Sequence, residues 1–136
     1  MEVKILRGSQ IPLHGTAEAA GYDIHAAEDV AMKPYEIRKI STGLRMQMPP
    51  GTHGMLYGRS SMGQRGLFVF PAIIDSDYRG EVMVQVMNLA GEERIIGKGN
   101  RIAQVIFEEH KTVTFREVDR LDVSERGSGG FGSTGK

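Results

Sequence analysis

The sequence predicts an all-β domain, and three observations support that prediction. Its 18 glycines are spread along 136 residues and separate short apolar runs, as in proteins built from many short strands. Several of these runs alternate apolar and polar residues with the period of two that a half-buried strand requires. Few windows have the apolar spacing of an amphipathic helix of ten or more residues. We therefore expect a β-sandwich or jelly roll.

The first half of the chain has clear strand and turn signals. Apolar side chains at 44, 46 and 48 alternate with Arg45 and Gln47, and two prolines and a glycine at 49–51 then predict a turn. The segment "SSMGQ" at 60–64 predicts one short helical turn with a serine as its N-cap. The apolar run 67–70 predicts a short strand that ends at a proline.

The second half predicts three more strands. Valines at 82, 84 and 86 lie on one face of the first, while its other face mixes polar residues with methionines. The segments "NLAGEE" and "GKGN" are typical of turns. Residues 102–107 are almost continuously apolar, which predicts a strand buried on both faces. Val113 and Phe115 alternate with polar neighbours and predict a last strand.

Composition excludes several classes of protein. Lys plus Arg and Asp plus Glu each number 17, so no overall field attracts nucleic acid or acidic membranes. Without cysteine the chain has no disulfide and no thiolate metal site, and the four histidines (14, 25, 53 and 110) show no ligand spacing. No stretch resembles a signal peptide or approaches the ~18 apolar residues of a membrane span. We expect a soluble, intracellular protein with no nucleic-acid or membrane partner.

The chain is expected to form one β domain over residues 1–123, followed by a flexible glycine-rich segment over 124–136. The ending "GGFGSTGK" matches part of the P-loop pattern, in which a glycine-rich loop binds phosphate before a helix. We do not expect a P-loop, because no strand precedes the match, no helix follows it, and the Ser or Thr that would hold Mg²⁺ is missing.

One turn has the composition of a site. The segment "IIDSDYRG" at 73–80 places two carboxylates, a tyrosine and an arginine beside two isoleucines. A solvated turn has no need of two adjacent isoleucines, so we expect this turn to line a binding pocket.

Five segments in this order and spacing resemble the five motifs of the trimeric dUTPase family. They are "AGYDIHA" (20–26), "GRSSMGQRG" (58–66), "IIDSDYRGEV" (73–82), "GNRIAQVIF" (99–107) and "RGSGGFGSTGK" (126–136). The resemblance covers nearly the whole chain. It implies a jelly-roll β-sandwich that forms a homotrimer with swapped C-terminal segments. It also implies hydrolysis of dUTP to dUMP and pyrophosphate, which keeps uracil out of DNA and supplies dUMP.

The resemblance assigns catalysis to Asp75. An ionised aspartate would orient a water for in-line attack on the α-phosphorus and accept its proton. Asp77, two residues further on, is interpreted as a turn or ion-pair carboxylate. The residues implied in phosphate binding are Arg59, Ser60, Ser61, Gln104, Arg126, Ser133 and Thr134. Mg²⁺ would be held mainly by the substrate phosphates and would reach Asp23 through water, although a capping role for Asp23 at a turn stays open.

The resemblance assigns nucleoside recognition to Ile73, Ile74, Tyr78, Met83 and Phe131. The backbone around the two isoleucines would read uracil, the Tyr78 ring would leave no room for a 2′-hydroxyl, and Phe131 would stack on the base. The last segment would close over the site as a lid, with Gly127, Gly129, Gly130 and Gly132 giving it flexibility.

The chain departs from the family pattern in one place. The run "GLFVFPAIID" at 66–75 is short, and Pro71 and Ala72 stand where many members have an Asn or Gly. Three alternatives remain: a dCTP deaminase-like relative, a regulatory nucleotide-binding protein of the same fold, and an RNA-binding module using "RGSGGFG". Against the deaminase, Gln85 stands where a catalytic glutamate would be needed, and a carboxamide cannot shuttle protons. Neutral charge argues against RNA binding.

Overall fold

The computed structural model describes residues 1–130, in which every strand pairing is antiparallel. The largest sheet has the strand order β2-β3-β12-β7-β9, so its strands come from both halves of the chain. These strands are β2 (Leu13–His14), β3 (Tyr22–His25), β12 (Arg101–Glu109), β7 (Thr52–Gly58) and β9 (Ala72–Asp75).

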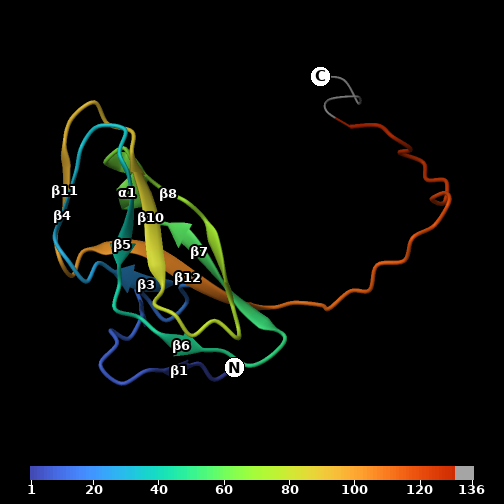
Figure 1. The fold of residues 1–136 in the computed structure, drawn as a ribbon, viewed down its shortest axis with the longest axis horizontal. Helices are drawn as coiled ribbons and strands as arrows, with labels where there is room; N and C mark the ends of the chain where they lie inside the picture. The colour runs from blue at the N-terminus through green and yellow to red at the C-terminus, as the bar shows by residue number, and fades with distance from the viewer. Residues whose placement is uncertain (131–136) are drawn as a thin grey trace.

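A second sheet and two short strand pairs complete the β body (Figure 1). The second sheet has the order β5-β10-β8, with β5 (Ile37–Ser41), β10 (Met83–Asn88) and β8 (Leu67–Val69). The pairs join β1 (Lys4–Ile5) to β6 (Met46–Gln47) and β4 (Val30–Met32) to β11 (Arg94–Ile96). The one helix among the described residues, α1 (Ser60–Gln64), follows β7.

Alternating apolar side chains build a single core, as the sequence predicts. Residues 44, 46 and 48 are buried while Arg45 and Gln47 are exposed, and the valines at 82, 84 and 86 are buried as well. One cluster joins these side chains to buried residues of β3, β7, β8 and β12. The all-β prediction is confirmed. No helix among residues 1–130 is long and apolar enough to cross a membrane.

β12 is buried less completely than its apolar sequence predicts. Ile102 and Ala103 are both buried because the pairing with β3 shifts register between Arg101 and Ala103, which turns two successive side chains inward. Beyond this bulge the strand alternates, and Ile106 lies half-buried on the outer face. The prediction of burial on both faces therefore holds only for the start of the strand.

Two local predictions are wrong. The residue that caps α1 is Arg59, and its side chain makes no capping hydrogen bond, so no serine acts as N-cap. No strand forms at Val113 and Phe115. Residues 111–123 instead extend away from the β body without a hydrogen bond to the rest of the described chain, and Phe115 is 93% exposed (Figure 1). A strand needs a neighbouring strand, and no strand of residues 1–130 pairs with this segment.

A buried amide ties two connections together at the end of β10, the one after β4 and the one before β11. The Asn88 side chain is fully buried, and its nitrogen donates to the carbonyl oxygens of Met32, Lys33 and Glu92. Its oxygen accepts from the Ala90 backbone N–H at 2.9 Å. These bonds satisfy every polar atom of the side chain, so they fix the loops at this end of the β5-β10-β8 sheet.

Candidate active site

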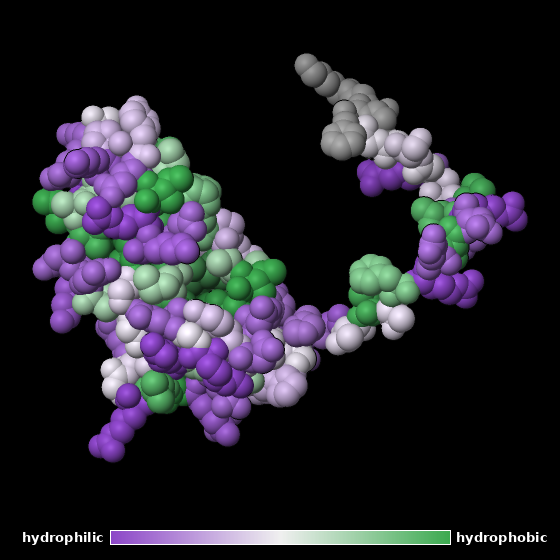
Figure 2. All heavy atoms as spheres, in the orientation of Figure 1, coloured by the Kyte–Doolittle hydropathy of each residue, from purple (hydrophilic) through white to green (hydrophobic). Residues whose placement is uncertain are grey.

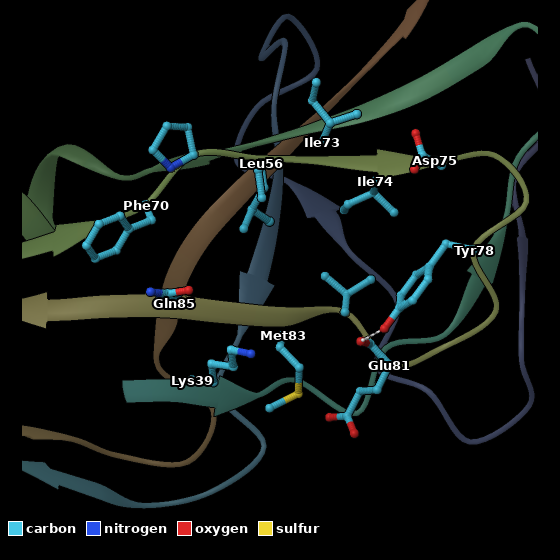
Figure 3. A pocket seen from close by; sticks show the side chains of 13 residues that line it. Lys39, Leu56, Phe70, Ile73, Ile74, Asp75, Tyr78, Glu81, Met83 and Gln85 are labelled. Atoms are coloured by element: carbon cyan, nitrogen blue, oxygen red, sulfur yellow. Dashed lines mark hydrogen bonds between the residues drawn. The ribbon is translucent and has the colours of Figure 1, made fainter. Parts of the chain in front are cut away.

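A pocket opens between β9 and β10, the two strands joined by residues 76–82. The strands are consecutive but do not pair with each other, because β9 pairs with β7 and β10 pairs with β5 and β8. The space between them has a volume of about 330 Å³ (Figure 3). Asp75, Tyr78, Ile73, Ile74 and Met83, all predicted as site residues, line this slot. Asp77 does not line it, which separates the two aspartates.

The backbone of β10 faces the slot with unpaired polar groups. The Phe70 N–H donates to the Gln85 carbonyl at 2.9 Å, so Gln85 presents its backbone to the β9 side of the strand. Met83, two residues earlier, presents its N–H and C=O toward the same side, because backbone direction alternates along a strand. Among the described residues no strand pairs with this edge opposite Met83, since the β8 pairing begins at Val86. A planar ring with donors and acceptors on its edge can bind here.

Tyr78 stands at the open end of the slot and folds back over its own turn. Its N–H donates to the Asp75 carbonyl at 3.1 Å, and its hydroxyl donates to the Glu81 carbonyl at 2.9 Å (Figure 3). The side chain is still 46% exposed. Tyr78 therefore presents a ring of defined position next to Asp75.

The Glu81 carboxylate fixes the connection after β5. It accepts hydrogen bonds from the Ser41 hydroxyl, from the Gly43 N–H at 2.8 Å and from the Thr42 N–H at 3.0 Å. Gly43 has a φ of 66°, a conformation that suits glycine and aims its N–H at the carboxylate. The hydrogen bond from Ser41, followed by those from Gly43 and Thr42, lowers the pKa of Glu81 below its ordinary value of 4.5.

Glu81→Gln should destabilise the protein at neutral pH and should not do so in acid. The glutamine keeps the shape but loses the charge-assisted hydrogen bonds, at a cost of about 1 kcal/mol. Because the folded-state pKa of Glu81 is lowered, its contribution is complete above the unfolded-state pKa and disappears as the pH falls through the folded-state pKa. Urea unfolding should show the wild-type advantage at pH 7 and its loss in the acid range below pH 4.5. An advantage independent of pH would contradict the charged role.

A second cluster of polar side chains surrounds Asp23 on β3. Nε of Arg59 lies 2.8 Å from one Asp23 oxygen, and Nη1 of Arg101 lies 3.2 Å from the other. Nη1 of Arg59 also donates to the Ser61 hydroxyl at 3.4 Å. Asp23 is 8% exposed, so the two guanidinium groups compensate a largely buried charge. Nε of Arg59 faces Asp23 and Nη1 faces Ser61, and a guanidinium has five N–H donors, so donors remain for a phosphate group.

Gln104 on β12 joins this cluster to β7. Its side-chain nitrogen donates to the Gly58 carbonyl at 3.3 Å. Its oxygen lies over Gly21, where an added Cβ would stand 2.5 Å from that oxygen. The glycine of "AGYD" therefore makes room for the carboxamide, and Gln104 lies next to Asp23 in the β3–β12 register.

In one chain the slot and this cluster lie apart. Asp75 is opposite His53 on β7, and His53 is opposite Glu108 on β12, whereas Gln104 is four residues earlier on β12. Two strand spacings and four strand residues place Asp75 and Gln104 about 17 Å apart. Arg59 and Ser60 line a different groove, beside α1 and β8, from the slot that Asp75 lines.

Four of the predicted lid residues lie far along the C-terminal segment. Arg126, Gly127, Gly129 and Gly130 lie on the extended C-terminal segment, away from both groups (Figure 1). Gly127 has a φ of 54°, and its N–H donates to Ser124. Phe131, Gly132, Ser133 and Thr134 lie outside the described residues.

Sequence reasoning missed four residues that hold the site residues in place. Arg101 is the second cation that pairs with Asp23. Glu81 fixes the end of the turn through its carboxylate. Gly21 leaves room for the Gln104 side chain, and Gly80 leaves room for the Tyr78 ring. All four belong to the quoted motifs, which is the signal that could have drawn attention to them. Their partners could not be foreseen, because each contact depends on how the folded segments pack.

The fold and these two groups define a class: an all-β protein with a cluster of arginine and serine side chains around a buried aspartate, and an open-strand slot lined by Asp75, Tyr78 and Glu81. A family model described as dUTPase matches residues 7–135. The chain belongs to the dUTPase family.

Relatives and solved structures agree with this assignment. A deoxyuridine 5'-triphosphate nucleotidohydrolase of Paramecium bursaria Chlorella virus 1 is 41% identical over 97% of this chain and 94% of its own. One of the same name from Nautilia profundicola is 42% identical over the whole of both chains. The structure of a mutant dUTPase of Staphylococcus bacteriophage 80alpha with dUpNHpp aligns with a TM-score of 0.91 at 26% identity, covering 99% of each chain.

Proposed function

We propose that this protein hydrolyses dUTP to dUMP and pyrophosphate. The slot between β9 and β10 is the observation that carries the proposal: an unpaired backbone edge, the Tyr78 ring and the Asp75 carboxylate line a space of about 330 Å³. The curated relatives bear the name of this activity, and one solved neighbour contains a dUTP analogue.

The slot suits uracil because its edge is fixed. Uracil presents acceptor, donor and acceptor groups in a row, whereas cytosine presents a different order. A rigid backbone edge at Met83 that pairs with uracil would leave unpaired polar groups against cytosine, a mismatch that discriminates strongly. The Gln85 carboxamide lies in the slot and exchanges no proton, which favours hydrolysis over deamination.

Asp75 is proposed as the catalytic residue. It is exposed at the end of β9 and lines the slot beside Tyr78, so a water between it and a bound nucleotide would lie near the α-phosphate. Its carboxylate would accept a hydrogen bond from this water, set its direction and take its proton during attack. Positioning of this kind accounts for most of the catalysis of phosphoryl transfer.

The Arg59 cluster is proposed to bind the triphosphate. The free guanidinium donors of Arg59, the hydroxyls of Ser60 and Ser61, and the Gln104 carboxamide offer charged and neutral donors to phosphate oxygens. No group of three metal-ligating side chains exists among residues 1–130, which fits a Mg²⁺ carried by the substrate phosphates and contacted by Asp23 through water. When bound, Mg²⁺ would neutralise charge on the phosphates.

The separation of the two groups supports an assembly of identical chains. A residue that orients water at the α-phosphorus and a residue that binds the same triphosphate cannot act together across about 17 Å of one sheet. We propose that the slot of one copy meets the Arg59 cluster of another in a homotrimer, so that each active site is shared between subunits.

Apolar surfaces support the exchange of C-terminal segments in this trimer. Val113, Phe115, Leu121 and Val123 are exposed along the extended segment, and Figure 2 shows apolar residues on it. The body has an apolar groove lined by Val3, Ile5, Ile11, Tyr22, Phe107 and neighbouring residues. We propose that the segment packs on another copy and brings the lid, including Arg126 and Phe131, to that copy's site.

A substrate comparison tests the proposed function. The protein should convert dUTP to dUMP and pyrophosphate with Mg²⁺ and should act poorly on dCTP, dTTP and UTP. Chromatography of the products after each incubation measures all four rates. Equal rates on the four nucleotides, or deamination of dCTP, would contradict the proposal.

A further inference from the structure

We infer that Gly80 is a specificity-determining position, because its missing side chain is what lets the Tyr78 ring lie where it excludes a ribonucleotide. A Cβ at Gly80 would stand 2.2 Å from the Tyr78 hydroxyl oxygen, 2.4 Å from Cζ and 2.8 Å from Cε2. Real contacts are never this short, so the ring and a side chain at position 80 cannot coexist in this arrangement. The identity of the substrate rests on the proposed function, whereas the position of the Tyr78 ring over Gly80 is independent of it.

The ring position depends on both ends of the turn. The Tyr78 hydroxyl reaches the Glu81 carbonyl only by crossing over Gly80. Glu81 is in turn held by its carboxylate on the backbone after β5. The ring therefore reaches from the turn after β9 toward Glu81 (Figure 3), so its distance from a bound sugar is set before substrate arrives.

Alanine at position 80 should move the ring and leave the turn in place. Gly80 does not have a left-handed φ, so alanine is compatible with its backbone. The bonds that close the turn do not involve its side-chain position: Tyr78 N–H to Asp75, and the Arg79 guanidinium to the Ser76 carbonyl at 2.8 Å. The ring is 46% exposed and lines the slot together with Val82 and Met83, so its free direction is outward into solvent, away from the sugar.

The consequence is a loss of sugar discrimination. With the ring displaced outward, a 2′-hydroxyl finds room, so UTP should become a better substrate relative to dUTP. For Gly80→Ala we expect the ratio of kcat/KM for dUTP to that for UTP to fall by about tenfold or more, the scale of a shape change in a binding pocket. Tyr78→Phe keeps the ring but loses the bond to Glu81, and should lower the ratio less.

The experiment compares four proteins: wild type, Gly80→Ala, Tyr78→Ala and the double variant. Tyr78→Ala should lower the dUTP/UTP ratio. The double variant should have the same ratio as Tyr78→Ala, because without the ring there is no clash with a side chain at position 80. Gly91→Ala is the matched control, since Gly91 lies in an open turn with no atom within 4 Å of an added Cβ, and its ratio should stay that of wild type. A wild-type ratio in Gly80→Ala, or a further fall in the double variant, would overturn the inference.

A readout independent of substrate separates this inference from the proposed function. Nuclear Overhauser contacts between the Tyr78 ring and the Gly80 α-protons should be present in the wild-type protein. In the Gly80→Ala variant, the contact to the remaining α-proton at position 80 should be lost. Absence of these contacts in the wild type would overturn the ring position itself. Failure to hydrolyse dUTP with these contacts intact would refute the activity and leave the geometry standing.

Discussion

Asp75→Asn should abolish most turnover and leave the protein folded and able to bind nucleotide. Asparagine is nearly isosteric with aspartate, and Asp75 is exposed at the end of β9, so the substitution should not lower the stability of the sheet. The water between this residue and the α-phosphorus would lose its anionic acceptor. We expect kcat to fall by about 10²-fold or more, the scale of a positioned base, with little change in the Kd of a non-hydrolysable dUTP analogue.

Asp77→Asn is the matched control for this variant. Asp77 is a neighbouring carboxylate that does not line the slot, so its loss should leave kcat within a few-fold of wild type. Single-turnover rates and analogue titration of both variants give the comparison. A reversed result, with Asp77→Asn inactive and Asp75→Asn active, would show that the water is oriented by the other aspartate.

Arg59→Gln should lower kcat/KM for dUTP by about 10²-fold, because removing a preorganised charged donor at phosphate costs about 3 kcal/mol. Part of the change is structural, since Asp23 would keep only Arg101, which is more exposed than Arg59. Melting of the variant and of Arg101→Gln separates the two effects. Arg101→Gln removes a cation from the same carboxylate and should lower stability with a smaller loss of activity.

The same two variants, Asp75→Asn and Arg59→Gln, test whether the site is shared. Asp75→Asn chains retain the Arg59 cluster, and Arg59→Gln chains retain the slot. After unfolding and refolding together in equal amounts, random trimers should place an intact slot beside an intact cluster in about a quarter of their sites. Activity near a quarter of wild type would support sites built between copies. Mixed trimers that stay inactive would show that each chain uses its own slot and cluster.

The strands with clear alternation were predictable, because burial on one face requires apolar and polar residues to alternate along the strand. Residues 44–48 and the valines of β10 are of this kind. Val113 and Phe115 show the same period and form no strand, because their segment has no partner strand among residues 1–130. The burial of Ala103 depends on a register shift between Arg101 and Ala103, which cannot be inferred from the alternation of residue types.

The site was predictable as a set of segments but not as an arrangement. The motif resemblance named Asp75, Tyr78 and Met83, which do share a pocket. It gave Asp23 a metal role, and that role stays a prediction, while the structure adds the two arginines that hold it. The split between slot and cluster follows from strand order β12-β7-β9, which sequence alone does not reveal. The Tyr78 ring occupies the place of a side chain at position 80 only in the folded turn, so this contact was not predictable from the sequence either.

Hydrolysis in ¹⁸O-labelled water identifies the phosphorus that is attacked, and the proposed mechanism depends on that atom. If the water oriented by Asp75 attacks the α-phosphorus, the new P–O bond forms there, the α–β bridge breaks, and pyrophosphate leaves. Mass spectrometry should then find one ¹⁸O in dUMP and none in pyrophosphate after a single turnover. Label in pyrophosphate, or dUDP and phosphate as products, would place the attack at another phosphorus and contradict the mechanism.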